Sequence, residues 1–175
     1  MHDFDLITGR QVNLERFNIS CITSEYLSWL CDPVVVRYSN QRFKQHTQQT
    51  CLDYLQAFST SPNLFLAIRL LGSHRLVGTM TAYVAVPHGT ADIGLMIGDR
   101  SHWGKGLGLD AWQTLMSYLL SGGFVRKVTG GTLGCNIGMI RIMERSGMLL
   151  EAVRSKQQIV EDEAQDEHLY AKFRI

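Results

Sequence analysis

Between residues 64 and 97 the chain carries three apolar, β-prone runs in close succession. The runs are Leu64–Leu70, 75–86 and Thr90–Ile97, and they are separated by two short turn sequences, 71–73 and 87–89. Turns this short join neighbouring antiparallel strands, because a parallel pair needs a crossover of a dozen residues or more. The chain is therefore predicted to build its core on an antiparallel meander.

Helical periodicity flanks this meander on both sides. Helices are expected at 24–30, from the cap residue Thr47 to about Phe58, at 107–119, and from Asn136 to about Met143. Further strands are expected at 12–14, 125–133, 148–159 and 168–173. The pattern predicts an α/β (α+β) fold in which about four helices flank a mixed, mostly antiparallel central sheet of about seven strands. We expect one domain that spans residues 1–175.

Composition argues against several classes of protein. The 17 Lys and Arg residues nearly balance the 16 Asp and Glu residues, which gives a formal net charge of +1. A nucleic-acid-binding domain usually carries a basic surface, so we expect no nucleic-acid partner. Hydrophobic residues make up 45% of the chain, which is enough to form a core without a metal or a disulfide.

Neither a metal site nor a membrane segment is predicted. The four cysteines form no Cys-x-x-Cys pair, and the six histidines show no metal-ligand spacing. No run approaches the roughly 18 apolar residues of a membrane helix. The first residues, Met1 to Asp5, lack the basic and apolar pattern of a secretory leader. We therefore expect a soluble, cytoplasmic protein.

The glycine-rich segment 97–108 joins a predicted strand to a predicted helix. Glycines at 104, 106 and 108 allow close approach of the backbone, and the free amides and dipole of a helix N-terminus favour an anion such as phosphate. The spacing fits neither a Walker A loop, which needs four residues between its glycines, nor a dinucleotide fingerprint in a parallel βαβ unit. An ordinary glycine-rich turn is the alternative.

Two motifs at a matching separation resemble those of the GNAT superfamily of acetyl-CoA-dependent N-acetyltransferases. Trp103-Gly104-Lys105-Gly106-Leu107-Gly108 resembles the first signature, Arg/Gln-x-x-Gly-x-Gly/Ala, and the stretch from Asn136 to Met148 resembles the second. Trp103 stands where many members have Arg or Gln, which is typical of the branch of ribosomal-protein N-terminal acetyltransferases and their small-molecule relatives. The order of predicted elements agrees along nearly the whole chain.

The resemblance implies a site for acetyl-CoA. Its pyrophosphate would lie over the backbone amides of 103–108, and its pantetheine arm would follow the strand near residue 97, like an added β-strand. The implied cofactor-contact residues are Met96, Ile97, Trp103, Gly104, Lys105, Gly106, Leu107, Gly108, Asn136, Met139 and Met143. Three alternatives stay open: a solvated Lys105, a purely capping Asn136, and methionines that belong to the core.

The resemblance also indicates how catalysis would proceed. Asp92 matches the acidic position that often serves as base in this branch, and its alternative is an ordinary strand carboxylate. Backbone groups near Leu95 and Met96 are expected to polarise the thioester oxygen. Many members protonate the leaving thiolate with a tyrosine seven residues after the motif asparagine, but that position is Met143 here. A tyrosine acid at that position is excluded.

The acceptor is expected to be a primary amine of modest basicity, because a larger fraction of such an amine is neutral at pH 7. A peptide α-amine, as at a protein N-terminus, and a small-molecule amine such as an amino sugar both satisfy this condition. The basic stretch 37–46 and the acidic turn at 161–163 are the candidate recognition segments. A catalytically silent module that binds CoA or another protein is the alternative function, and a homodimer is one possible assembly.

Overall fold

The computed structural model describes residues 6–123 and 125–174, so positions 1–5, 124 and 175 of the expected domain lie outside the described residues. The strands are β1 (Leu6–Thr8), β2 (Val12–Arg16), β3 (Leu64–Leu70), β4 (Leu76–Ala85), β5 (Thr90–Ile97), β6 (Lys127–Leu133), β7 (Leu149–Val160) and β8 (Glu163–Phe173). The α-helices are α1 (Ser24–Cys31), α2 (Gln48–Ser59), α3 (Leu107–Ser121) and α4 (Ile137–Arg145). Short 3₁₀ turns occur at Ile19–Cys21, Asn40–Phe43, Val86–His88 and Arg100–His102.

All eight strands of the described residues join one sheet, in the order β1-β2-β3-β4-β5-β6-β8-β7. Neighbouring strands run antiparallel except for the parallel pair β5 and β6. The predicted meander is confirmed as β3, β4 and β5, and the predicted α/β class is confirmed as well. About seven strands were expected, which is one fewer than the eight observed in the described residues. The missed strand is β1, which has only three residues and shows no recognisable pattern.

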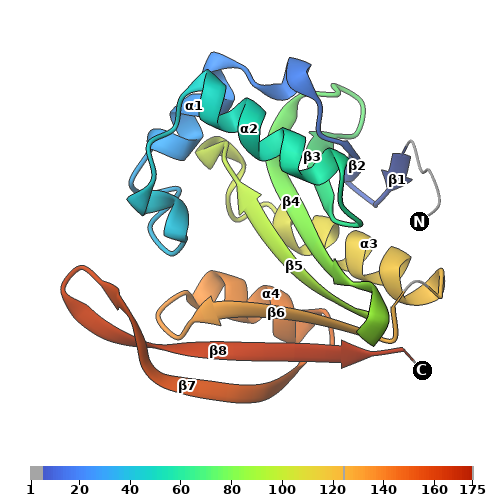
Figure 1. Cartoon of the computed structure of the whole chain (residues 1–175), viewed down its shortest axis with the longest axis vertical. Helices are drawn as coiled ribbons and strands as arrows, with labels where there is room; N and C mark the ends of the chain where they lie inside the picture. The colour runs from blue at the N-terminus through green and yellow to red at the C-terminus, as the bar shows by residue number, and fades with distance from the viewer. Residues whose placement is uncertain (1–5, 124, 175) are drawn as a thin grey trace.

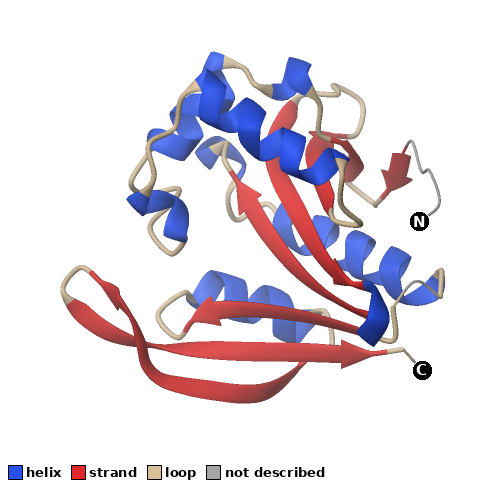
Figure 2. Ribbon diagram, viewed as in Figure 1, coloured by secondary structure: helices blue, strands red, loops and turns tan. Residues whose placement is uncertain are grey.

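Two helix pairs cover opposite faces of the sheet (Figures 1 and 2). The larger core cluster lies between the sheet and α3, and includes Trp112 of α3 and Met143 of α4. The second cluster holds α1 and α2 against the other face through aromatic residues such as Trp29 and Phe65. No helix in the described part of the chain is both long and apolar enough to cross a membrane.

Side-chain caps begin the helices where the sequence predicts. Thr47 accepts a hydrogen bond from the Thr50 amide at 3.2 Å, and the Thr50 hydroxyl accepts one from the Thr47 amide at 2.9 Å. This reciprocal arrangement satisfies two amides that otherwise lack partners at the start of α2. Gly147, with φ of 73°, ends α4 in the left-handed conformation, also as predicted.

The second strand of the long β7–β8 hairpin begins earlier in the sequence than predicted. Glu161 and Asp162 form its turn with φ values of 51° and 66°, and Val160 pairs with Glu163. Two successive residues with positive φ match the twist of a tight two-residue hairpin turn. The polar stretch from residue 163 therefore belongs to β8, although its composition resembles a loop.

The parallel contact between β5 and β6 is short, and this decides where a site can form. Paired residues run only from Thr90 with Lys127 to Asp92 with Thr129. Beyond them β5 remains attached to β4, since the amides of Gly98 and Asp99 both donate to the Val77 carbonyl. β6 instead stays paired with β8 along its length, so the two halves of the sheet diverge (Figure 1).

Candidate active site

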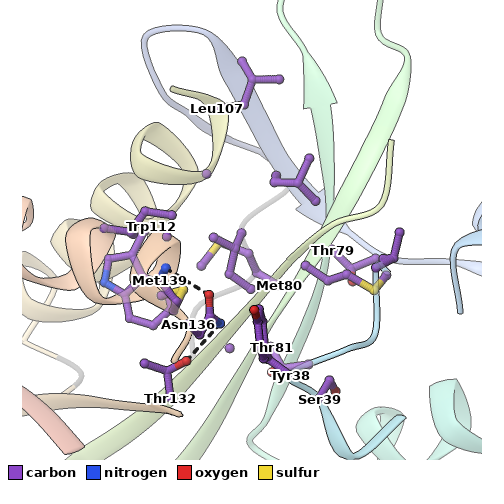
Figure 3. Close-up of a pocket in the computed structure, with 18 of the residues that line it drawn as sticks. Tyr38, Ser39, Thr79, Met80, Thr81, Leu107, Trp112, Thr132, Asn136 and Met139 are labelled. Atoms are coloured by element: carbon purple, nitrogen blue, oxygen red, sulfur yellow. Dashed lines mark hydrogen bonds between the residues drawn. The ribbon is translucent and has the colours of Figure 1, made fainter. Parts of the chain in front are cut away.

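A cleft of about 860 Å³ opens where β5 and β6 diverge. Its walls come from β4, β5, the loop before α3, the start of α4 and the segment that joins α1 to α2 (Figure 3). All of the predicted cofactor-contact residues line it except Lys105 and Met143. Motifs separated by about 30 residues in the sequence thus meet around one cavity.

The three motif glycines are required for two different reasons. Gly104 and Gly106 adopt φ values of 73° and 85°, a left-handed conformation that costs glycine little. A Cβ atom at Gly104 would meet no atom within 4 Å, so the space beside this backbone is open. A Cβ atom at Gly108 would instead lie 3.1 Å from Ile142 Cδ1 and 3.2 Å from Leu95 Cδ2. Gly108 therefore allows α3 to pack closely against α4 and β5.

The N-terminus of α3 faces the cleft without a side-chain cap. Gly106 is its N-cap residue and offers no side chain to the first amides, while Leu107 and Gly108 both line the cavity. Unsatisfied amides and the positive end of the helix dipole make this an anion-binding geometry. The open backbone at Gly104 beside it leaves room for a bound anion.

Asp110 is a buried acidic residue that sequence reasoning missed. Its carboxylate accepts hydrogen bonds from the amides of Arg10, Gln11 and Val12 at 3.0, 2.7 and 3.1 Å. These bonds attach the first turn of α3 to the turn between β1 and β2, which fixes the helix start in place. An acidic residue in a first helical turn was the available signal.

Asp99 and Trp103 hold the loop that precedes the glycines. Asp99 accepts bonds from the Ser101 amide at 3.0 Å and the Ser101 hydroxyl at 2.6 Å, and it lies 2.9 Å from His102 Nδ1. Burial of this carboxylate acts to raise its pKa, but the hydrogen bonds from Ser101 and His102 outweigh burial and lower the pKa. The Trp103 indole donates to the Ile97 carbonyl at 2.7 Å, so this acceptor at the end of β5 is already engaged.

At the opposite wall, Asn136 caps α4 as predicted. Its Oδ1 accepts a bond from the Met139 amide at 3.3 Å, and its Nδ2 donates to the Thr132 hydroxyl at 3.0 Å (Figure 3). Asn136 and Met139 line the cleft. Met143 does not, which corrects its expected role as a cofactor contact: one turn further along, the helix packs Met143 into the core with 0% of its surface exposed.

Two arginines of α4 also line the cleft. Arg141 and Arg145 both line the cavity, and both side chains are on the exposed side of the helix. Their i, i+4 spacing places them on one helical face, and this spacing was a readable signal that the sequence interpretation did not use. Lys105, the predicted phosphate contact, is exposed and lies outside the lining residues.

Asp92, the predicted base, lies at the point where β5 and β6 separate. Its carboxylate accepts a hydrogen bond from the Thr129 hydroxyl at 2.7 Å, and Tyr83 is its direct partner on β4. The surrounding protein desolvates the carboxylate and raises its pKa, with a smaller contribution from Glu167, while the Thr129 bond opposes the shift. Asp92 itself does not line the cleft, although its neighbours Tyr83 and Ile93 do.

The sequence matches a family model over most of its length. Residues 14–149 match the acetyltransferase (GNAT) domain. The chain belongs to the GNAT acetyltransferase family. The matched range contains both the glycine loop and Asn136, which line one cleft. No curated protein sequence matches this GNAT chain significantly.

Solved structures agree with the GNAT fold. A GNAT-family acetyltransferase from Bacillus anthracis is 19% identical with a TM-score of 0.80, and the match covers 97% of this chain and 98% of that one. The ribosomal L7/L12 α-N-protein acetyltransferase RimL, in complex with CoA, is 14% identical with a TM-score of 0.82 and coverages of 96% and 97%. Spermidine N-acetyltransferase from Vibrio cholerae, in complex with CoA and spermine, is 13% identical with a TM-score of 0.80 and coverages of 94% and 96%.

Proposed function

We propose that this protein transfers the acetyl group of acetyl-CoA to a primary amine, either a peptide α-amine or a small-molecule amine such as an amino sugar. The observation that carries the proposal is the cleft between β5 and β6, with the uncapped start of α3 and the open glycine loop at one end. The similar solved structures include enzymes named for a protein α-amine and for spermidine, so they do not select the acceptor.

The cofactor end of the cleft fits a multiply charged anion. Arg141 and Arg145 would hold phosphate oxygens together with the amides at the start of α3. The backbone of β5 beyond Asp92 offers donors and acceptors for the amides of the pantetheine arm, apart from the Ile97 carbonyl that Trp103 occupies. Acetyl-CoA would supply the reactive acetyl thioester.

The reaction needs a neutral amine and a group that accepts its proton. The amine nitrogen bonds to the acetyl carbon, the carbon–sulfur bond breaks, and the nitrogen gives one proton to Asp92. Because Asp92 does not line the cleft, a water molecule relays this proton. The raised pKa of Asp92 makes this carboxylate a stronger base than an ordinary aspartate.

The leaving thiolate takes up a proton from water, and Asp92 gives its proton to the hydroxide that remains, which restores the carboxylate. Met143 occupies the position where many relatives carry a tyrosine acid, and this methionine is fully buried. A thiol with a pKa of about 8.5 is an adequate leaving group without a strong acid. The same substitution favours the second candidate function, a silent module that binds CoA without catalysis.

Two measurements separate these functions. Isothermal titration with acetyl-CoA tests the cofactor site, and acetyl-CoA consumption with peptide, amino-sugar, polyamine and lysine acceptors, followed by product mass spectrometry, tests transfer. The proposal expects binding and a mass gain of one acetyl group on an amine. Binding without turnover across the whole panel would support the silent module, and absence of binding would reject both.

A further inference from the structure

The wall of the cleft that α1, α2, the segment between them and β4 form has a consistent chemical character. Four of the six tyrosines of the chain line the cleft, and two threonines of β4 lie among them. We call this part the acceptor chamber, formed by Tyr26, Tyr38, Tyr54, Thr79, Thr81 and Tyr83. It combines flat aromatic faces with neutral hydroxyl groups.

Hydrogen bonding and burial fix the state of part of the acceptor chamber. Tyr54 and Tyr83 share a hydrogen bond of 2.7 Å between their hydroxyl oxygens, and Tyr54 packs edge-on against Phe65 with ring centroids 5.3 Å apart. Burial raises the pKa of Tyr54 and also that of Tyr26, so both keep their protons. Tyr83 is 44% exposed, which leaves its ring accessible from the cleft.

The charges around the cleft disfavour a polycation. Among the described residues that line it, none is Asp or Glu, while Arg37, Arg141 and Arg145 are all cationic. Arg37 is the only one of these three beside the acceptor chamber, and it pairs with Glu161 at 2.7 Å. A polyamine would therefore find no carboxylate in the lining to compensate its additional charges.

Two contacts join the walls beside the acceptor chamber. The Arg37–Glu161 pair joins the segment between α1 and α2 to the tip of the β7–β8 hairpin, and Arg42 donates to the Ile159 carbonyl at 3.1 Å in the same region. Both contacts are made by exposed side chains. An extended polypeptide that passes between these two segments would have to break both contacts, whereas a compact molecule would not.

We infer that the acceptor is an amino sugar, an amine carried on a compact, uncharged and hydroxyl-rich ring, either free or linked to a nucleotide. Apolar C–H faces of a sugar ring pack on aromatic rings, and its hydroxyls exchange hydrogen bonds with Tyr and Thr side chains. This inference rests on the proposed acetyl transfer and narrows its acceptor. The nitrogen loses its proton and gains the acetyl group as described above.

The first test compares acceptors on the unmodified protein. The panel holds free amino hexoses with the amine at different carbons, their nucleotide-linked forms, N-terminal tetrapeptides and spermidine, and the readout is kcat/KM from acetyl-CoA consumption. We expect the best amino sugar to exceed the best peptide and spermidine by at least about tenfold. The ratio of kcat/KM for free sugars to kcat/KM for nucleotide-linked sugars shows which form is the acceptor.

The outcomes separate this inference from the proposed function. Preference for a peptide or spermidine overturns the inference and leaves acetyl transfer intact. Binding of acetyl-CoA without turnover of any amine overturns the inference in favour of the silent module. Failure to bind acetyl-CoA at all, by isothermal titration, overturns the proposed function itself.

A second test measures whether the aromatic ring of Tyr83 binds the sugar. Tyr83→Ala is expected to raise the sugar KM about tenfold or more without changing the Kd for CoA, whereas Tyr83→Phe keeps the ring and recovers most of the loss. Tyr118→Phe, on α3 and outside the cleft lining, is the matched control and should behave like the parent. An unchanged KM in a folded Tyr83→Ala protein would overturn the inference.

Discussion

The two ends of the cleft are built from different parts of the chain. At the proposed cofactor end, the backbone forms the site: two left-handed glycines and an uncapped helix start come from one continuous segment. At the proposed acceptor end, side chains form the site, and they come from α1, the following segment, α2 and β4. One end is local in sequence and the other is assembled from distant elements.

This difference shows why only one end has a recognisable motif. A backbone that takes positive φ favours glycine, although Glu161 and Asp162 also adopt it, and a close approach such as that at Gly108 leaves little room for a Cβ atom, so glycine at these positions can be read from the sequence. An aromatic wall can be supplied by many residues from many positions, and nothing in the local sequence marks it. Substitutions at the two ends should therefore have different effects, which the following experiments compare.

The largest effect is expected for Gly106→Val. Valine is strained at φ of 85°, and its Cβ atom would lie 3.4 Å from Gln11 Nε2, so the backbone that is proposed to hold a phosphate would have to shift. We expect CoA affinity to fall by about 100-fold or more, as measured by isothermal titration. A folded variant with parental affinity would show that the loop does not bind the cofactor.

Gly72→Val is the matched control for this substitution. Gly72 has φ of 88° and open space around its Cβ position, but it lies in the turn between β3 and β4, outside the cleft lining. Both variants should lose about 1–3 kcal/mol of stability from backbone strain. Only the Gly106 variant should lose CoA binding, so equal loss in both would indicate a general effect of instability.

Asp92→Asn is expected to lower kcat by about 100-fold while the Kd for CoA stays nearly constant, because a positioned base is lost. The pKa of Asp92 is raised, so the acidic limb of the kcat/KM profile should lie above the usual aspartate range of about 3.9. This limb should disappear in the variant. A parental profile in Asp92→Asn would remove Asp92 from the reaction.

Asp92→Asn should also change how the stability of the protein depends on pH. Because folding raises the pKa of Asp92, the folded state favours the protonated form, and the parent loses stability as pH rises through that pKa. Asp92→Asn does not titrate, so its Tm relative to the parent should increase between pH 3 and pH 7. A constant difference in Tm over this range would contradict the raised pKa.

A smaller effect is expected at the two arginines of α4. Arg141→Ala and Arg145→Ala should each weaken CoA binding by about tenfold. Each change removes one charge-assisted contact, and such a contact contributes about 1.5–3 kcal/mol. The loss should be smaller for dephospho-CoA if the arginine concerned contacts the 3′-phosphate. Lys105→Ala is the control from the same end of the cleft, since Lys105 lies outside its lining. Equal losses in all three variants would indicate general electrostatic attraction.

The smallest effect is expected for Tyr54→Phe at the acceptor end. This change removes the hydroxyl bond to Tyr83 but keeps the ring packed against Phe58 and Phe65. We expect a loss of about 0.5–1.5 kcal/mol in the free energy of unfolding, measured by urea denaturation, with CoA affinity unchanged. A change in CoA affinity would mean that the two ends of the cleft are coupled.

Most elements of the fold were predictable because their signals are local. Apolar, β-prone runs between short turns marked β3, β4 and β5, and the cap residues Thr47 and Asn136 marked the starts of α2 and α4. Strand β1 was missed because it is only three residues long, and β8 was started late because its first residues are polar. Pairing with a neighbouring strand determines both segments, and sequence periodicity does not record that pairing.

The candidate site divides in the same way. The sequence by itself determined the glycine loop that we propose binds the cofactor, since Gly104, Gly106 and Gly108 meet backbone requirements that few other residues satisfy. Only the tertiary structure decided that Met139 lines the cleft while Met143 lies in the core, and that four distant tyrosines line one cavity. The physical reason is that φ is a property of one residue, whereas burial and cavity lining depend on what other segments pack alongside it.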